Sequence, residues 1–522
     1  MQHLIGRLTQ ALTQHAIGLW RGWGIVFLLS LGLRLWGLGR FNTLVFDEVY
    51  FANFAAEFLQ GRQAFGGHPP LDTYLIAVGI WVGEWVGLGD AATRNSLTGM
   101  HLSTLSYRWL NAVTGAVLPL VAGAIALQLT HRRGYALVAA VVVALDGLFL
   151  VESRYALNNV YLVLFGLVGH LGLLLALNRL NQERQELQFF SKPRRWWVWL
   201  ALTLAGVGFG ASIAVKWNGA GFWLGAIALW GLAWALRLAS RRVGGHQPVE
   251  SVERASALSL ISPLAALTRL SGFQVLFTFG AMPALTYYLL WLPYMRLDPT
   301  LSFWQWQTSV LDYHNRVGGA EAHPYCSDWL SWLWMQRPIA YFYQTAHAAG
   351  PPPPIVGPPL PATAARIAYD VHAMGNPVLW WLSTLAVLAL ALGLGLALVD
   401  MTRRAVRGNG ARWMKGSGRS PALLGWAALF LVVNWVANWL PWASVSRCLF
   451  LYHYMPSLLF SMLAIALLLY LGLASPHQWH RVLSLALMAL MAIAFVYWLP
   501  LYLGLPLSPS ELADRRWFPS WI

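Results

Sequence analysis

The sequence predicts an all-α protein that crosses a membrane many times, and this prediction depends on its composition and its long apolar runs. Of its 522 residues, 58% have hydrophobic side chains and only 11% are charged. Soluble globular domains contain about 25% charged residues, so the composition excludes a soluble protein. The apolar residues are also collected into long segments, which is the pattern of membrane-spanning helices.

Eleven segments are long and apolar enough to span a bilayer, which takes about 20 residues each. They lie at 22–40, 105–129, 134–152, 156–177, 197–214, 219–239, 272–293, 377–399, 421–440, 447–471 and 482–505. The first contains Arg34 and is not followed by a cleavage site of small residues, which favours a retained helix over a signal peptide. We expect one membrane-embedded domain over residues 1–522.

A further apolar run, Leu71–Leu88, contains Asp72 and Glu84, and whether it crosses the membrane decides the topology. If it lies along the surface, the main basic loops all fall on one side, at 131–133, 179–195, 237–269 and 403–419. Basic loop residues collect on the cytoplasmic side. We therefore predict a surface helix here, a cytoplasmic N-terminus and an external C-terminus. The net charge of +15 then follows from topology and needs no nucleic-acid partner.

This topology predicts two long external loops, at 41–103 and 294–375. The first contains two interfacial helices, one beginning at Asp47 and one following His68-Pro69-Pro70, where proline suits the first helical turn. The second is rich in tryptophan and contains the run 351–354 of four prolines, which predicts a stiff linker. Its aromatic residues either line a groove for an extended acceptor or form an interfacial belt.

The unusual polar residues of the chain converge on the external side in this topology. They are Asp47, Glu48, Arg108, Glu152, Arg154, Asn159, Lys216, Arg447 and His453. Charges near the membrane are costly and usually occupy a cavity or an ion pair, so their collection on one side indicates a site. Because most of the charged members are cations, we expect the site to bind an anion at the bilayer surface.

Each of these residues also has a structural interpretation. Asp47 and Glu48 are equally consistent with helix-capping acids that complement the helix dipole. Arg154 and Arg447 are consistent with basic anchors at span ends. Asp146, inside the third span, pairs with a basic residue or caps backbone groups, and the sequence assigns it no role in the site.

The two cysteines raise the questions of a disulfide and of a metal site. Cys326 and Cys448 are the only cysteines, and we expect free thiols in preference to a bridge. His323, Cys326 and Asp328 resemble sparse metal ligands, but no second ligand pair accompanies them, so we expect no metal.

Several motifs, taken together and in order, resemble those of the protein O-mannosyltransferases. They are Phe46-Asp47-Glu48-Val49, His68-Pro69-Pro70-Leu71, Ser153-Arg154-Tyr155, Val215-Lys216-Trp217, Pro441-Trp442 with Arg447, and Tyr452-His453-Tyr454 with Pro456. The resemblance covers about residues 40–460. It implies a GT-C glycosyltransferase fold of about 11 spans in the cell (inner) membrane, of the bacterial type that lacks the separate sugar-binding-like domain of eukaryotic members.

The resemblance also implies an activity and roles for particular residues. The family transfers mannose from polyprenyl-phosphate mannose to Ser or Thr hydroxyls of translocated proteins, and a contact with the secretion machinery is a further expectation. The expected catalytic residues are Asp47, as base, and Glu48, as its support. The expected donor-phosphate ligands are Lys216, Arg447, Arg108 and His453, and the expected supports of the cleft are Arg154, Asn159 and His68. The family pattern leads us to expect an acid near position 159, where this chain has an amide.

The expected chemistry needs no metal or other cofactor, because fixed cations can stabilise the leaving phosphate while one carboxylate activates the acceptor hydroxyl. Two alternatives stay open. A related lipid-carrier glycosyltransferase would modify a lipid or a glycan in the same kind of cleft, and the late Arg and Tyr-His-Tyr motif favours protein over these acceptors. A transporter of lipid-linked sugars would show repeated halves, and the sequence shows none.

Overall fold

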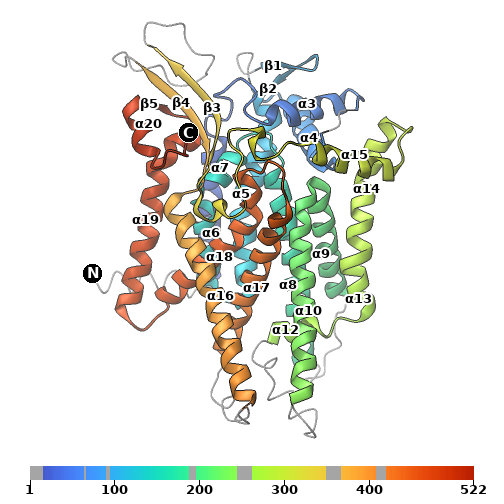
Figure 1. Cartoon of the computed structure of the whole chain (residues 1–522), viewed down its shortest axis with the longest axis vertical. Helices are drawn as coiled ribbons and strands as arrows, with labels where there is room; N and C mark the ends of the chain where they lie inside the picture. The colour runs from blue at the N-terminus through green and yellow to red at the C-terminus, as the bar shows by residue number, and fades with distance from the viewer. Residues whose placement is uncertain are drawn as a thin grey trace.

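The computed structural model describes residues 16–63, 66–89, 94–186, 196–243, 262–347, 366–406 and 419–522. Within these residues, nine helical segments are long and apolar enough to cross a membrane. They are Thr104–Thr130, Asn159–Gln182, Trp196–Val215, Trp217–Ala239, Gly272–Leu297, Pro377–Asp400, Leu424–Ser444, Leu451–Leu473 and Gln478–Leu503. These segments correspond to nine of the eleven predicted spans, and they run side by side in one bundle (Figure 1).

Each of these spans coincides wholly or in large part with one long helix. The bounds of these helices are α5 (Thr104–Thr130), α8 (Asn159–Glu186), α9 (Trp196–Val215), α10 (Ala220–Val243), α14 (Met282–Leu297), α16 (Pro377–Val406), α17 (Arg419–Trp439), α18 (Met455–Leu473) and α19 (Gln478–Leu503). Helix α14 continues α13 (Gly272–Leu276) through the π-helical turn Phe277–Ala281. Helix α12 (Ser262–Leu267) precedes α13.

The other two predicted spans have a different form. Helix α2 (Ala16–Leu35) is an apolar helix of 20 residues that is not among the nine. The segment predicted at 134–152 is broken into α6 (Arg133–Ala144) and α7 (Gly147–Glu152). The break occurs at Asp146, whose Oδ1 caps α7 by accepting a hydrogen bond of 2.9 Å from the Phe149 N–H. The count of eleven spans therefore stays a prediction.

Two more helices and a hairpin lie in the first of the two loops that were predicted to be external. They are α3 (Glu48–Leu59), α4 (Leu71–Trp85), β1 (Arg94–Leu97) and β2 (Met100–Ser103). Helix α4 has 15 residues, too few to cross a bilayer of ordinary thickness. It packs against α3 and α5, and the indole Nε1 of Trp109 donates a hydrogen bond of 2.8 Å to the carbonyl of Gly79. Its length and position agree with the prediction that Leu71–Leu88 does not cross.

The second loop predicted to be external contains strands that the all-α prediction did not include. Its elements are α15 (Phe303–Arg316), β3 (Ile339–Ala346) and β4 (Ile367–Ala373), with β5 (Pro506–Leu507) and α20 (Pro509–Arg515) added from the C-terminus. The antiparallel sheet has the order β3-β4-β5. The predicted linker at 351–354 lies outside the described residues. The C-terminus, the described parts of both predicted external loops and the sheet lie at the same end of the bundle (Figure 1).

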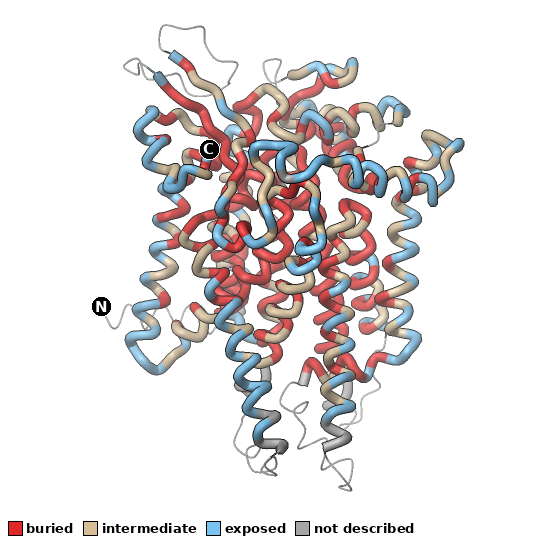
Figure 2. Tube along the Cα trace, viewed as in Figure 1, coloured by how far each residue is buried: buried red, intermediate tan, exposed pale blue. Residues whose placement is uncertain are grey.

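Helix α18 is the centre of the bundle. It packs against α5, α6, α8, α16, α17 and α19, and most of its side chains are buried. A helix that is apolar on all sides is stable only when neighbours surround it. Figure 2 shows buried residues concentrated in the middle of the bundle, while the lower part of α16 and much of α19 are exposed. Their exposed residues are apolar, among them Leu392, Leu396, Ile493 and Val496, which is typical of a surface that contacts lipid.

Candidate active site

Asp47 lies in the turn before α3, at the end of the bundle that carries the sheet β3-β4-β5. It occupies the N-cap position, but its side chain makes no capping hydrogen bond with the described first turn of α3. The side chain is half-buried, and burial raises the pKa of Asp47 to about 6, while the nearby Lys216 ammonium limits this rise. A carboxylate with this pKa is ionised at neutral pH and can accept a proton.

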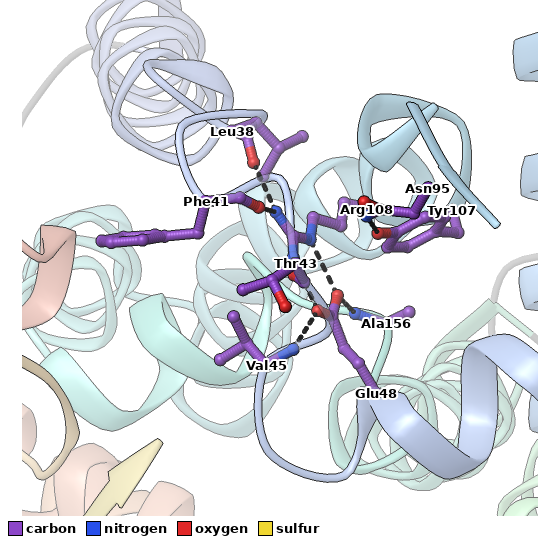
Figure 3. A network of polar contacts seen from close by, with 9 residues as sticks. All are labelled: Leu38, Phe41, Thr43, Val45, Glu48, Asn95, Tyr107, Arg108 and Ala156. Carbon is purple, nitrogen blue, oxygen red and sulfur yellow. Dashed lines mark hydrogen bonds and ion pairs between the residues drawn. The ribbon is translucent and has the colours of Figure 1, made fainter. Parts of the chain in front are cut away.

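Glu48, the next residue, has a different environment. Its carboxylate is fully buried and forms two hydrogen bonds with the Arg108 guanidinium, from Nε to Oε1 (2.8 Å) and from Nη2 to Oε2 (2.6 Å). It also accepts hydrogen bonds from the backbone N–H groups of Val45 (2.9 Å) and Ala156 (2.8 Å). Figure 3 shows this network. Glu48 therefore fixes the turn that presents Asp47.

Arg108 completes the same network from α5. Besides Glu48, its guanidinium donates hydrogen bonds to the carbonyl groups of Leu38 (3.0 Å), Phe41 (2.7 Å) and Thr43 (2.8 Å). The side chain is fully buried. All three nitrogens thus already have protein partners. These contacts connect α5 to the segment between α2 and α3. The sequence analysis predicted Arg108 as a phosphate ligand, whereas its contacts in the structure are with protein groups.

Arg154 and Asn159 also make contacts within the protein. The Arg154 guanidinium donates to four carbonyl groups at the end of α2, those of Leu33, Arg34, Trp36 and Gly37. This contact satisfies carbonyls that a helix end leaves unpaired. The amide of Asn159 donates to Glu152 Oε2 (3.1 Å). Position 159, where the family pattern leads us to expect an acid, thus has an amide that contacts the buried carboxylate of Glu152, seven residues earlier.

Lys216 is the central cation of the site. It lies between two spans, is buried, and its Nζ is 5.1 Å from the ring centroid of Tyr452. Burial and the neighbouring charge of Arg447 lower the pKa of Lys216 to about 8, although the carboxylates of Asp47, Glu152 and Asp72 act in the opposite direction. The Lys216 ammonium thus interacts with the charges of a second cation and of three carboxylates.

Arg447 lies in the segment before α18, and a disulfide fixes this segment. Cys326 and Cys448 are bonded to each other, with their Cα atoms 5.2 Å apart, so the expectation of free thiols is wrong. The backbone N–H of Ser327 also donates to the carbonyl of Leu449 (2.8 Å). A separation of 122 residues hid this pairing from the sequence. The bond attaches the second external loop beside Arg447, and it removes Cys326 from the metal-ligand alternative.

Three histidines surround the cations. His453 is buried, its Nδ1 lies 3.0 Å from the Phe450 backbone nitrogen, and its ring packs against Trp442 with a centroid distance of 4.6 Å. His68 and His314 have ring centroids 5.2 Å apart. Burial lowers the pKa of both, with Lys216 and Arg447 adding to the effect, to about 4 for His314 and well below the usual value for His68. Both imidazoles are therefore neutral at pH 7.

His314 belongs to α15, an element that the sequence analysis did not connect with the site. The neighbouring Tyr313 ring lies so close to Gly67 that a Cβ there would come within 2.2 Å of it. Gly67 also has a φ of +69°, which suits glycine. A hydrogen-bonded chain holds α15 near the lysine: Trp217 Nε1 donates to the Tyr287 hydroxyl (3.0 Å), which donates to Gln307 (2.6 Å).

The structure thus divides the predicted site residues into two groups. Asp47, Lys216, Arg447, His453 and His68 form one cluster through their charge interactions and ring contacts, and the structure adds Glu152, His314 and Tyr452 to this cluster. Glu48, Arg108, Arg154 and Asn159 support it from behind through contacts with protein groups. A carboxylate close to two cations at one end of a helical membrane bundle can accept a proton and stabilise an anionic leaving group, which is the chemistry of a membrane glycosyltransferase.

Comparisons with known proteins specify the family. Residues 24–261 match the model of the dolichyl-phosphate-mannose-protein mannosyltransferases, and residues 299–521 match the C-terminal four-transmembrane region of protein-O-mannosyltransferase. The chain belongs to the protein O-mannosyltransferase family.

Individual relatives extend over nearly the whole chain. The polyprenol-phosphate-mannose–protein mannosyltransferase of Mycolicibacterium smegmatis is 24% identical, over 96% of this chain and 93% of the relative. The protein of the same name from Mycobacterium tuberculosis is 24% identical, over 96% of this chain and 92% of the relative. The Saccharomyces cerevisiae Pmt1-Pmt2 complex bound to the sugar donor has a similar fold, with a TM-score of 0.68 at 14% identity, covering 99% of this chain and 94% of that chain.

Proposed function

We propose that this enzyme transfers mannose from polyprenyl-phosphate mannose to the hydroxyl group of a Ser or Thr residue in an extended polypeptide. The names of the mycobacterial relatives support the donor and the protein acceptor. The observation that carries the chemistry is the half-buried Asp47 carboxylate, with a pKa of about 6, facing Lys216. A base that acts on the acceptor hydroxyl and a cation that acts on the leaving phosphate suit an inverting displacement.

In this proposal the two sides of the cleft act on the two ends of the reaction. Asp47 accepts the proton of the acceptor hydroxyl as its oxygen bonds to the anomeric carbon of mannose. The bond from that carbon to the phosphate oxygen breaks, and polyprenyl phosphate leaves with the electron pair. Lys216 and Arg447 stabilise the phosphate charge, and fixed cations in a partly dry cleft do so strongly. These cations take the place of a metal or other cofactor.

The remaining predicted residues have narrower roles in the proposal. The Nε2 atom of His453 is the one that faces the phosphate, because its Nδ1 is hydrogen-bonded to Phe450. Glu48 and Arg108 act by holding the turn before α3, and neither touches substrate. His68 remains a support of the cleft, together with His314.

We also propose that the site faces the extracytoplasmic side of the cell membrane, with the N-terminus in the cytoplasm. The Cys326–Cys448 disulfide lies beside the site, and disulfides form and persist in oxidising compartments. The opposite end of the bundle carries basic residues such as Arg132 and Arg133, as the positive-inside tendency requires. A polypeptide acceptor is still extended while it is translocated to this side of the membrane. We therefore continue to expect a contact with the secretion machinery.

The acceptor is tested with purified enzyme and polyprenyl-phosphate mannose that carries radiolabelled mannose. Two peptides are compared, which are identical except that one has Thr where the other has Val. We expect label on the Thr peptide alone, with the anomeric configuration inverted relative to the donor. Transfer only to a lipid or a glycan would overturn the protein acceptor and retain the glycosyltransferase. Movement of intact donor across a vesicle membrane, with no transfer, would instead support a transporter.

A further inference from the structure

Phe46, the residue immediately before Asp47, has an unusual backbone conformation. Its φ is 51°, and only three other non-glycine residues in the described part of the chain have a positive φ. The left-handed region brings Cβ close to the backbone and is disfavoured for a bulky side chain. Such a conformation persists only when its surroundings impose it, and it occurs most often at functional sites. The contacts of Phe46 therefore identify what holds the Asp47 turn.

The Phe46 ring stacks on the ring of Tyr341. Their centroids are 4.2 Å apart and their planes differ by 9°. Two further rings meet Phe46 edge-on, those of Phe450 at 6.5 Å and Tyr452 at 6.4 Å. Tyr452 in turn lies under the Lys216 ammonium, at 5.1 Å. The stack therefore connects the residue beside the proposed base to the proposed phosphate side of the cleft.

Tyr341 is fixed at its other end by Glu152. Its hydroxyl donates a hydrogen bond to Glu152 Oε1, and Asn159 donates to Oε2 of the same carboxylate. Glu152 is fully buried and Tyr341 almost so. A buried carboxylate with both oxygens hydrogen-bonded is a rigid anchor, because leaving either oxygen unpaired would be costly. The ring and the hydroxyl of Tyr341 are thus both held.

A β-bulge aims Tyr341 at this anchor. The register of β3 against β4 shifts between Ala340 and Phe342, where Ala340 pairs with His372 and Phe342 pairs with Val371. Tyr341 is the extra residue, without a cross-strand partner. Bulges re-aim a side chain and often lie next to active sites. The bulge turns Tyr341 inward, whereas Tyr343, two residues further along, is 52% exposed.

We propose that Tyr341 is a positioning residue for the Asp47 turn: anchored on Glu152, it holds Phe46 in the left-handed conformation and so directs the Asp47 carboxylate into the cleft. This inference rests on the proposed function. It assigns the second external loop a part in catalysis, because β3 reaches the first loop where the base is presented.

The test compares Tyr341→Phe and Tyr341→Leu with the matched control Tyr343→Leu on the same strand. Tyr341→Phe keeps the stack and loses the anchor, and Tyr341→Leu loses both. Single-turnover transfer is measured at saturating donor and divided by the number of donor-binding sites, so that misfolded protein does not enter the rate. We expect losses of about 10-fold for Tyr341→Phe and about 100-fold for Tyr341→Leu, within the usual contribution of a positioned base. Tyr343→Leu is expected to match wild type.

A second readout separates positioning from a structural role. Donor dissociation constants should stay within about twofold of wild type in both Tyr341 variants, because the proposed phosphate ligands are untouched. Glu152→Leu, which removes the acceptor of the Tyr341 hydroxyl, should slow transfer in the same way. Adding it to Tyr341→Phe should cost little more, since both changes remove the same hydrogen bond. Unchanged rates per donor site, or donor binding lost in proportion to transfer, would overturn the inference.

Release of mannose to water distinguishes failure of the inference from failure of the proposed function. Hydrolysis of the donor without peptide still needs a base but no protein acceptor. If wild type hydrolyses the donor and never labels a peptide, the proposed acceptor is wrong. The hydrolysis rates of the Tyr341 variants relative to wild type then still decide the role of Tyr341. If wild type neither binds nor hydrolyses this donor, the proposed function fails and the inference fails with it.

Discussion

The pKa values of Asp47 and Lys216 make the pH dependence of the reaction a test of their roles. The pKa of Asp47 is raised to about 6 and that of Lys216 is lowered to about 8. Below the first value Asp47 is protonated and cannot accept a proton, and above the second Lys216 is neutral and cannot stabilise phosphate. We therefore expect kcat/KM to rise through about pH 6 and to fall through about pH 8.

Initial rates at subsaturating donor measure this profile. His314, with its pKa lowered to about 4, titrates too low to produce the acid limb. A profile that stays flat through pH 6 would contradict the role of Asp47. Loss of the alkaline limb in Lys216→Arg, which stays charged at high pH, would assign that limb to the lysine.

The buried pair of Glu48 and Arg108 predicts a stability effect. Glu48→Gln leaves the Arg108 charge buried without its partner, which commonly costs about 3–5 kcal/mol. The control is the Glu84–Arg94 pair, at 3.1 Å and with side chains 25% and 31% exposed, where Arg94→Gln should cost about 0–1 kcal/mol. Thermal unfolding of the purified protein measures both. Equal shifts in the unfolding temperature would show that the buried pair does not hold the turn.

Asp47 and Glu48 also show how far residue roles could be predicted. Their adjacency and the family resemblance made both candidates for catalysis. Near a helix N-terminus, consecutive side chains point about 100° apart, since the helix has 3.6 residues per turn. One carboxylate therefore faces the cleft while the other is buried against α5. Which of the two carboxylates is buried depends on the position of Arg108. The sequence does not reveal the contact between Glu48 and Arg108, because the two residues are 60 positions apart.

The disulfide between the second external loop and the segment before α18 gives a prediction about these elements. Cys326→Ser, Cys448→Ser and the double variant all lose the same bond, so we expect them to behave alike. Each should lose about 2–4 kcal/mol of stability, and transfer should slow because Arg447 adjoins Cys448. Thermal unfolding and transfer assays measure both effects. Thiols that react with a maleimide in unreduced, denatured protein would contradict the bond.

Helices were predicted from sequence far better than strands. Nine predicted spans match apolar helices, because a span satisfies its backbone hydrogen bonds locally and its apolar run is visible. The strands were missed because their partners are distant: β4 pairs with β3 and also with Pro506–Leu507 near the C-terminus. The role of Tyr341 depends on a register shift within such a pair. The break at Asp146 was missed because it is marked by a single polar side chain, which caps the start of α7 within an otherwise apolar run.

The orientation of the whole molecule is tested with engineered cysteines. Glu321→Cys lies in the second external loop and Arg132→Cys follows α5 at the opposite end, and both positions are exposed. The native cysteines are bonded to each other and should not react. In intact cells, we expect a membrane-impermeant maleimide to label position 321 and not position 132. The reverse pattern would invert the proposed topology.

For the whole chain, the family resemblance predicted the function, whereas the pattern of apolar residues predicted only the fold class. Apolar runs predict a membrane bundle, but they do not distinguish an enzyme from a transporter. The ordered motifs from Phe46 to Pro456 made that distinction, and the two family models covering 24–261 and 299–521 confirm the family. The sequence also predicted that its polar residues gather at one end of the bundle. It could not separate those that face the cleft from those that support it, because buried contacts decide this.

Single-turnover transfer by Asp47→Asn is the most direct test of the proposed mechanism. Donor affinity is measured in the same preparation, and Asp312→Asn, an exposed acid on α15, is the matched control. With Asp47 as the base, the variant should bind donor like wild type and transfer mannose about 100-fold to 10,000-fold more slowly, while the control transfers normally. Transfer at the wild-type rate by Asp47→Asn would show that this carboxylate is not the base.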